Sequence, residues 1–133
     1  MKYLWITSIP PFQPLLDFDI KGINIDLHND FGCININANN SSIEFSFLRT
    51  VGNEFYKEQN AVIIFNDIIE CNIELLKQNR QLGDITTLTN FAKGALSEDH
   101  KYYDAKDISY FFLDFFEGEL IEILCKEGII FLW

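Results

Sequence analysis

The stretch GINIDLHNDFGCININANNSSIEFSF, residues 22–47, decides the fold of this chain, because its apolar side chains recur at every second position. Three segments alternate in this way: Ile23, Ile25 and Leu27, then Ile34, Ile36 and Ala38, then Ile43, Phe45 and Phe47. Such alternation is typical of antiparallel strands that bury one face. Clusters of Asn, Asp, Gly and Ser, which favour tight turns, separate the three segments. The sequence therefore predicts a three-stranded antiparallel meander over residues 20–48.

The middle of the chain predicts another strand and a helix. The run AVIIF, residues 61–65, is typical of a buried strand. Residues 67–80 fit either a strand or a helix, and their β-branched content favours the strand. In residues 83–97 the apolar side chains fall at helical spacing, so we expect a helix there, with Asp84 as its N-cap.

The end of the chain predicts three more strands. Residues 108–133 contain three apolar runs, and the short turns between them carry Gly118 and Gly128. A helix over residues 107–117 is the alternative for the first run. Residues 1–133 are thus predicted to form a single α+β domain, mainly antiparallel β. Its sheet or sandwich should have about seven strands, with one or two helices.

Composition indicates a folded protein without a membrane span. The 133 residues are 48% hydrophobic and 23% charged, and a chain of this length buries roughly two-thirds of its surface on folding. No run reaches the roughly 18 uncharged apolar residues of a membrane-spanning helix, and the N-terminal apolar run is too short for a signal peptide. The cysteines, Cys33, Cys71 and Cys125, lack any paired spacing, which is typical of a reducing compartment. We therefore expect a cytoplasmic protein with no membrane partner.

Catalysis finds no support in the sequence. His28 and His100 are the two candidate bases, and neither lies in a known catalytic motif. Asp26 and His28, or the acidic residues around His100, resemble parts of a metal site, but both patterns are more typical of solvated turns and loops. No glycine-rich phosphate loop is present. We predict that the protein is not an enzyme and uses no metal and no cofactor.

Acidic charge bears most directly on function. The chain has 20 Asp and Glu against 10 Lys and Arg, a net charge of -10. Such a charge repels phosphate backbones, which argues against direct nucleic-acid binding, and it attracts a basic protein. From residue 98 to residue 127, nine acids stand against three lysines and are mixed with aromatic side chains. Acids that speed encounter beside aromatics that anchor a partner predict a protein-binding surface, with a merely solvated sheet face as the alternative.

Alternation within residues 119–125 places the acids relative to the core. Ile121, Ile123 and Cys125 share one parity and are expected to face the core. Glu122 has the other parity, so we expect it to point outward between two leucines.

Three stretches carry a resemblance to a known group of proteins: PLLDFDIKGINIDLHND, AVIIFNDIIECNIELL and FLDFFEGELIEIL. Their order, with the small size, the acidic charge and the Ile- and Asn-rich composition, resembles mainly β immunity proteins of bacterial polymorphic toxins, including those of contact-dependent growth inhibition. The resemblance implies a bacterial cytoplasmic toxin inhibitor that neutralises one toxin domain, typically a nuclease with a basic active site. On this interpretation the partner-binding residues are Asp107, Asp114, Glu117, Glu119 and Glu122, with Tyr102, Tyr103 and Tyr110 as anchors.

Two other functions remain open at this point. One is a non-catalytic β-rich module of a phage or secretion assembly, in which the acids serve only solubility. The other is a small metal-dependent enzyme that uses His28 or His100.

Overall fold

The structure, a computed structural model, describes residues 2–10, 13–52, 57–73, 87–94, 107–115 and 120–133. The strands are β1 (Lys2–Trp5), β2 (Gln13–Pro14), β3 (Asp17–Ile20), β4 (Ile23–Asp26), β5 (Phe31–Ala38), β6 (Ser42–Arg49), β7 (Asn60–Ile73), β8 (Leu88–Lys93), β9 (Ser109–Phe115) and β10 (Leu120–Leu132). The helical part of these ranges is one 3-10 turn, η1 (Ile6–Ser8). Within them no helix has the length and apolar character needed to cross a membrane. The mainly antiparallel β prediction is confirmed, whereas the predicted helix is wrong where the structure describes it.

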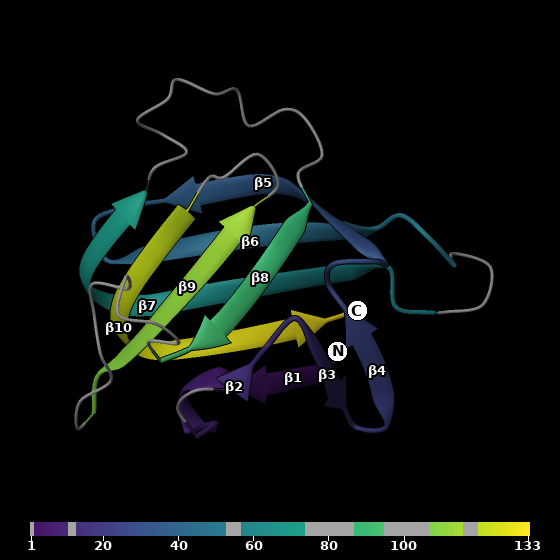
Figure 1. Cartoon of the computed structure of the whole chain (residues 1–133), viewed down its shortest axis with the longest axis horizontal. Coiled ribbons are helices and arrows are strands. Elements are labelled where there is room, and N and C mark those ends of the chain that lie inside the picture. The colour runs from purple at the N-terminus through teal and green to yellow at the C-terminus, as the bar shows by residue number, and fades with distance from the viewer. Residues whose placement is uncertain (1, 11–12, 53–56, 74–86, 95–106, 116–119) are drawn as a thin grey trace.

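One sheet holds most of the strands, and it folds over on itself. Its order is β2-β8-β9-β10-β7-β6-β5, and β1 also pairs with β10. The long strand β10 lies between β9 and β7 in its first half and between β1 and β7 in its second half. Near the middle of β7, Asp67 has a positive φ of 53° and the register shifts, so the strand bends. As a result β8 and β9 cross in front of β6 and β7 (Figure 1).

The core lies between these two layers and is largely aromatic. Phe45 of β6 stacks on Phe115 of β9 with ring centroids 6.2 Å apart. Phe65 of β7 contacts Phe111 at 5.1 Å and Phe91 at 6.4 Å. Because each such pair adds about 0.5–1.5 kcal/mol to the burial of the rings themselves, these contacts hold the folded-over layers together.

The predicted meander is right for two of its three strands. β5 and β6 pair as expected, but β4 pairs with β3 in a separate two-stranded sheet. Lys21 and Gly22 explain this pairing, since their φ values of 49° and 82° give the tight turn that joins two strands directly. At the other end of β4, the carboxylate of Asp26 accepts hydrogen bonds from the backbone N–H groups of His28 and Asn29, at 3.1 and 2.9 Å. This turn directs the chain away from β4.

A bulge in β5 changes which of its side chains face the core. The register with β6 shifts between Cys33 and Asn35. Cys33 and Ile36 are therefore both buried, whereas Ile34, which the alternation assigned to the core, is 39% exposed. The extra residue in a bulge reverses the side-chain alternation that follows it.

A second bulge explains why the predicted helix is wrong. Residues 88–93 form strand β8, and its register with β9 shifts between Leu88 and Asn90. Leu88 and Phe91 thus reach the same core although they are three residues apart. That spacing is also typical of a helix face, so the sequence pattern could not separate the two structures. Most of the remaining predicted helix lies outside the described residues.

Residues 67–73 continue β7, so the strand interpretation of this segment is confirmed as far as the structure describes it. Residues 109–115 form β9 instead of the alternative helix. The predicted turn at Gly128 is wrong: this glycine pairs with Phe65 inside β10, whereas Gly118 lies outside the described residues. A Cβ atom at residue 128 would lie 2.9 Å from Cγ1 of Ile6, so the close packing of η1 against β10 requires glycine here.

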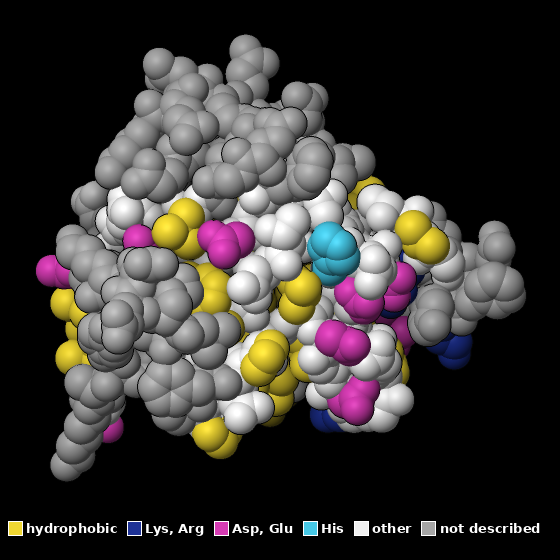
Figure 2. All heavy atoms as spheres, viewed as in Figure 1, with side chains coloured by type: hydrophobic (Ala, Val, Ile, Leu, Met, Phe, Trp, Pro, Cys, Tyr) yellow, Lys and Arg dark blue, Asp and Glu magenta, His cyan; other side chains and the backbone are white. Residues whose placement is uncertain are grey.

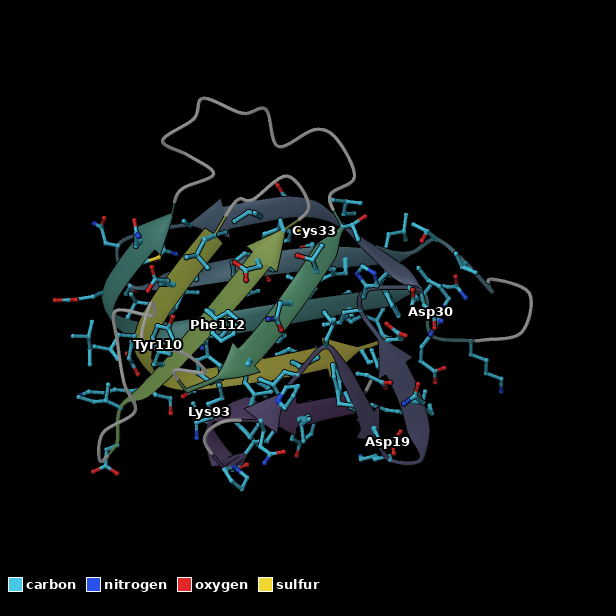
Figure 3. All side chains as sticks on the ribbon, in the orientation of Figure 1. Asp19, Asp30, Cys33, Lys93, Tyr110 and Phe112 are labelled. Atoms are coloured by element: carbon cyan, nitrogen blue, oxygen red, sulfur yellow. The ribbon has the colours of Figure 1, made fainter. Side chains whose placement is uncertain are left out.

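The N-terminal segment is held to β8 by a buried lysine. Lys93 is 6% exposed, and its Nζ donates to the carbonyls of Thr7 at 2.9 Å and Ile9 at 2.6 Å. The lysine lies where β8 approaches this segment (Figure 3). It therefore donates to one backbone carbonyl within η1 and to one just after it.

Candidate functional site

Half of the predicted partner-binding residues are described by the structure. Asp107 is exposed and has a positive φ of 61°, and Asp114 is half-buried on β9. Tyr110 and Glu122 lie on β9 and β10. The others, Tyr102, Tyr103, Glu117 and Glu119, fall outside the described residues.

Two of the predicted surface residues are buried. Tyr110 is 0% and Glu122 6% exposed. The Tyr110 hydroxyl donates to Oε2 of Glu122 at 3.3 Å, and the side-chain amide of Asn72 donates to Oε1 at 3.4 Å. The three side chains come from the neighbouring strands β9, β10 and β7, which the sheet places side by side.

The alternation in β10 is nevertheless as predicted. Ile121, Ile123 and Cys125 lie in the main core, and Glu122 faces the other side of the sheet. That side carries a second apolar cluster, formed by Ala92, Tyr110 and Phe112 with Leu120 and Leu124 packed against it. Figure 3 shows Tyr110 and Phe112 together on β9. Because Glu122 is part of this packed layer, its expected exposure is wrong and a partner could not reach it without rearrangement.

Two cationic side chains of the described residues, those of Arg49 and Lys93, are buried. Arg49 is 2% exposed: its Nε donates to the carbonyl of Glu58 at 2.8 Å, its guanidinium lies 4.5 Å from the ring centroid of Phe31, and it pairs with Asp30 at 3.6 Å. Lys93 is buried against the N-terminal carbonyls described above. Both cationic groups therefore stabilise the fold through hydrogen bonds to backbone carbonyls.

The acids show the opposite distribution. In the described ranges eleven acids are exposed or half-buried: Asp17, Asp19, Asp26, Asp30, Glu44, Glu58, Asp67, Glu70, Asp107, Asp114 and Glu127. Four lysines are comparably accessible in the same ranges: Lys2, Lys21, Lys57 and Lys126. Lys2 is already paired with Glu58. Among the described residues, the accessible side chains are thus more acidic than composition alone indicates.

Acidic side chains gather over the β3–β4 hairpin and the turn that follows it (Figure 2). The amide of Asn24 donates to Asp17 at 2.6 Å and to Asp19 at 3.3 Å. Partial burial acts to raise the pKa of Asp26, but hydrogen bonds from Asn29 and His28 outweigh it and lower the pKa below 3.8. The Asp26 carboxylate is therefore ionised at neutral pH and extends the acidic surface.

His28 has a structural role in this turn. Its Nδ1 lies 2.9 Å from the carbonyl of Leu88, so Nδ1–H donates to that oxygen and ties the turn to β8. Across the part of the chain that the structure describes, no three His, Cys, Asp or Glu side chains converge as metal ligands. His100 lies outside that part.

The sequence did not predict an apolar groove on the outer side of the sheet. Tyr3 and Trp5 of β1 are 50% and 43% exposed. They line a groove of about 370 Å³ whose other walls come from β7 and β10: Ile64, Asn66, Glu127, Ile129 and Phe131. The sequence does place large apolar residues at alternate positions in KYLW and in IIFLW. These residues indicate a groove only once it is known that the two segments pair as neighbouring strands.

No protein-family model, curated protein or solved structure matches this chain.

Proposed function

We propose that this protein is a non-catalytic binding protein that neutralises a basic toxin domain, as the bacterial immunity proteins it resembles do. The observation that carries the proposal is the surface charge. Eleven acids of the described residues are accessible, against four lysines, while Arg49 and Lys93 are buried. A nuclease must attract phosphate, so its active site is basic, and an acidic protein surface is complementary to it.

Charge would act mainly on the rate of encounter. Oppositely charged surfaces raise association rate constants from a typical ~10⁵–10⁶ M⁻¹s⁻¹ to as much as ~10⁸–10⁹ M⁻¹s⁻¹ at low salt. Salt screens this attraction, with a Debye length of about 8 Å at physiological ionic strength. Choice among toxins would depend on specific contacts, because many basic domains share the same charge.

The direct test uses the C-terminal domain of the protein encoded by the gene immediately upstream, which on this proposal is the toxin. We expect the two purified proteins to bind, the toxin to lose activity in the complex, and the association rate to fall steeply with salt in stopped-flow measurements. Absence of both binding and inhibition would overturn the proposed function.

Charge variants test which acids take part. Asp17→Asn combined with Asp19→Asn, and separately Asp107→Asn, should slow association and flatten its salt dependence if these surfaces face the partner. Asparagine suits residue 107 because it tolerates the positive φ found there. Lys57→Gln is the matched control: it also removes one exposed charge, but of the opposite sign, and should not slow association.

A further inference from the structure

We propose that the groove between β1, β10 and β7 receives an arginine side chain of the partner protein. The inference rests on the proposed function in one respect, namely that the partner is a basic protein. Beyond the proposed function, it specifies where the partner makes one contact and that the group bound there is a guanidinium.

The strand register orders the groove from an aromatic end to an acidic end. Tyr3 pairs with Phe131, and Trp5 pairs with Ile129, which in turn pairs with Ile64. Beyond this row Glu127 pairs with Asn66. The groove floor is thus apolar, with a carboxylate at one end.

The carboxylate is held in place and can still accept hydrogen bonds. Oε1 of Glu127 accepts from the side-chain amide of Asn66 at 3.1 Å. In the described part of the chain this amide is the one donor to Glu127, so Oε2 has acceptor capacity for a ligand. A half-buried, oriented carboxylate beside apolar walls favours a cation that brings several N–H donors in one plane.

Arginine fits both ends of this groove. Its guanidinium can donate to Glu127, and its methylene stem can lie on Ile64 and Ile129. Aromatic rings such as that of Trp5 attract a guanidinium that stacks on them. At about 370 Å³ the groove is near the lower end of the ~300–1,000 Å³ typical of ligand sites, which suits one side chain better than a larger ligand.

The same face already holds a cation over one of its rings. Nζ of Lys21 lies 5.7 Å from the ring centroid of Tyr3. Yet the residues that line the groove include no Lys or Arg, so the acidic end is not neutralised from within the described chain. A second copy of this protein would bring another net charge of -10 and another Glu127 against the first. A basic partner is therefore the occupant that the charges favour.

The first test uses N-acetyl-arginine amide as the probe and NMR of the two tryptophan indole N–H groups. Trp133 is the internal control, because it is also exposed, at 45%, but does not line the groove. We expect saturable shifts of the Trp5 signal and not of the Trp133 signal. N-acetyl-norleucine amide, which has a similar stem without charge, should bind about tenfold more weakly, and Glu127→Gln should weaken arginine binding by a similar factor.

Three results of the probe experiments would overturn the inference: no shift at Trp5, equal binding of the norleucine probe, or unchanged binding by Glu127→Gln. Glutamine keeps the size of the side chain, so near-ultraviolet circular dichroism should confirm that this variant is folded. A dimer in sedimentation that Trp5→Ala abolishes would also overturn it, because the occupant would then be a second copy.

The second test uses the toxin domain. Trp5→Ala and Glu127→Gln should each weaken the complex about tenfold or more, mainly through faster dissociation, whereas Trp133→Ala should not. If the toxin domain binds all variants equally, the groove inference fails while the proposed function stands. If the arginine probe binds in the groove but no toxin domain is bound, the proposed function fails and the groove remains a cation site.

Discussion

Replacing Gly128 by alanine should destabilise the protein, although removing a glycine from a strand ordinarily stabilises one. The new Cβ would lie 2.9 Å from Cγ1 and 3.1 Å from Cδ1 of Ile6, and 3.3 Å from Cδ1 of Phe65. Both neighbours are fully buried, so neither can move aside freely. Overpacking of this kind destabilises by about 1–3 kcal/mol, and the gain in backbone entropy offsets about 0.5–1 kcal/mol of that. We expect a net loss of about 1–2 kcal/mol.

Urea unfolding followed by tryptophan fluorescence measures this loss. With a slope of ~1–3 kcal/mol per M, the transition midpoint of Gly128→Ala should fall by roughly 0.5–1 M with the slope unchanged. An unchanged slope would show that the substitution alters stability and leaves the surface exposed on unfolding the same.

A double-mutant cycle identifies the cause. Ile6→Ala removes the atoms that clash and by itself should destabilise by about 2–5 kcal/mol. In that background Gly128→Ala should be neutral or stabilising, a coupling of about 1–2 kcal/mol. Gly22→Ala is the control, because no atom lies within 4 Å of its added Cβ and its penalty comes from the φ of +82°. That penalty should be the same in both backgrounds, and an equal loss for Gly128→Ala in both would refute the packing argument.

Three further predictions follow from buried polar groups. Lys93→Met should lower the free energy of unfolding by about 2 kcal/mol or more, with faster hydrogen exchange in η1 and β1, because two backbone carbonyls lose their charged donor. Tyr110→Phe should lower the free energy of unfolding by about 1 kcal/mol in urea unfolding, because the Glu122 carboxylate loses a hydrogen-bond donor. The loss should be smaller in a Glu122→Gln background, where the acceptor is no longer charged. Burial raises the pKa of Cys33 from 9.0 to about 12. The unfolded chain therefore loses this proton first, and stability should fall between pH 9 and pH 12 by up to about 1.4 kcal/mol per pH unit. Urea midpoints of Cys33→Ala should fall less over this range, and an equal fall would contradict the assignment.

Alternation predicted which side chains face the core where it continues without interruption, as in β6. It did not do so beside the bulges of β5 and β8. Ile34 and Leu88 both lie beside register shifts, and neither shift leaves a signal in composition. One added residue in a strand reverses the alternation of the side chains that follow it. Leu88 and Phe91 therefore face the same core at a spacing of three residues, which is also typical of a helix.

The site was less predictable than the fold, because exposure depends on what covers a strand. Alternation correctly separated Glu122 from the core, but a sheet can bury both faces, and here Tyr110 and Phe112 form a second cluster beside it. The groove depends on the pairing of β1 with β10, which no local pattern encodes. Acidic charge, in contrast, could be counted directly from the sequence, and the structure shows which acids of the described residues are accessible.

The pairing of β1 with β10 also has a consequence for biosynthesis. Lys2 pairs with Leu132, so β1, which is translated before the other described strands, lacks this strand partner until β10 has been made. Closing so long a loop is entropically unfavourable and slow. Until β10 is available, the aromatic side chains of β1 remain unpaired with that strand, and a chaperone that binds nascent chains could bind them during this interval. We infer that the aromatic groove is among the last surfaces to form.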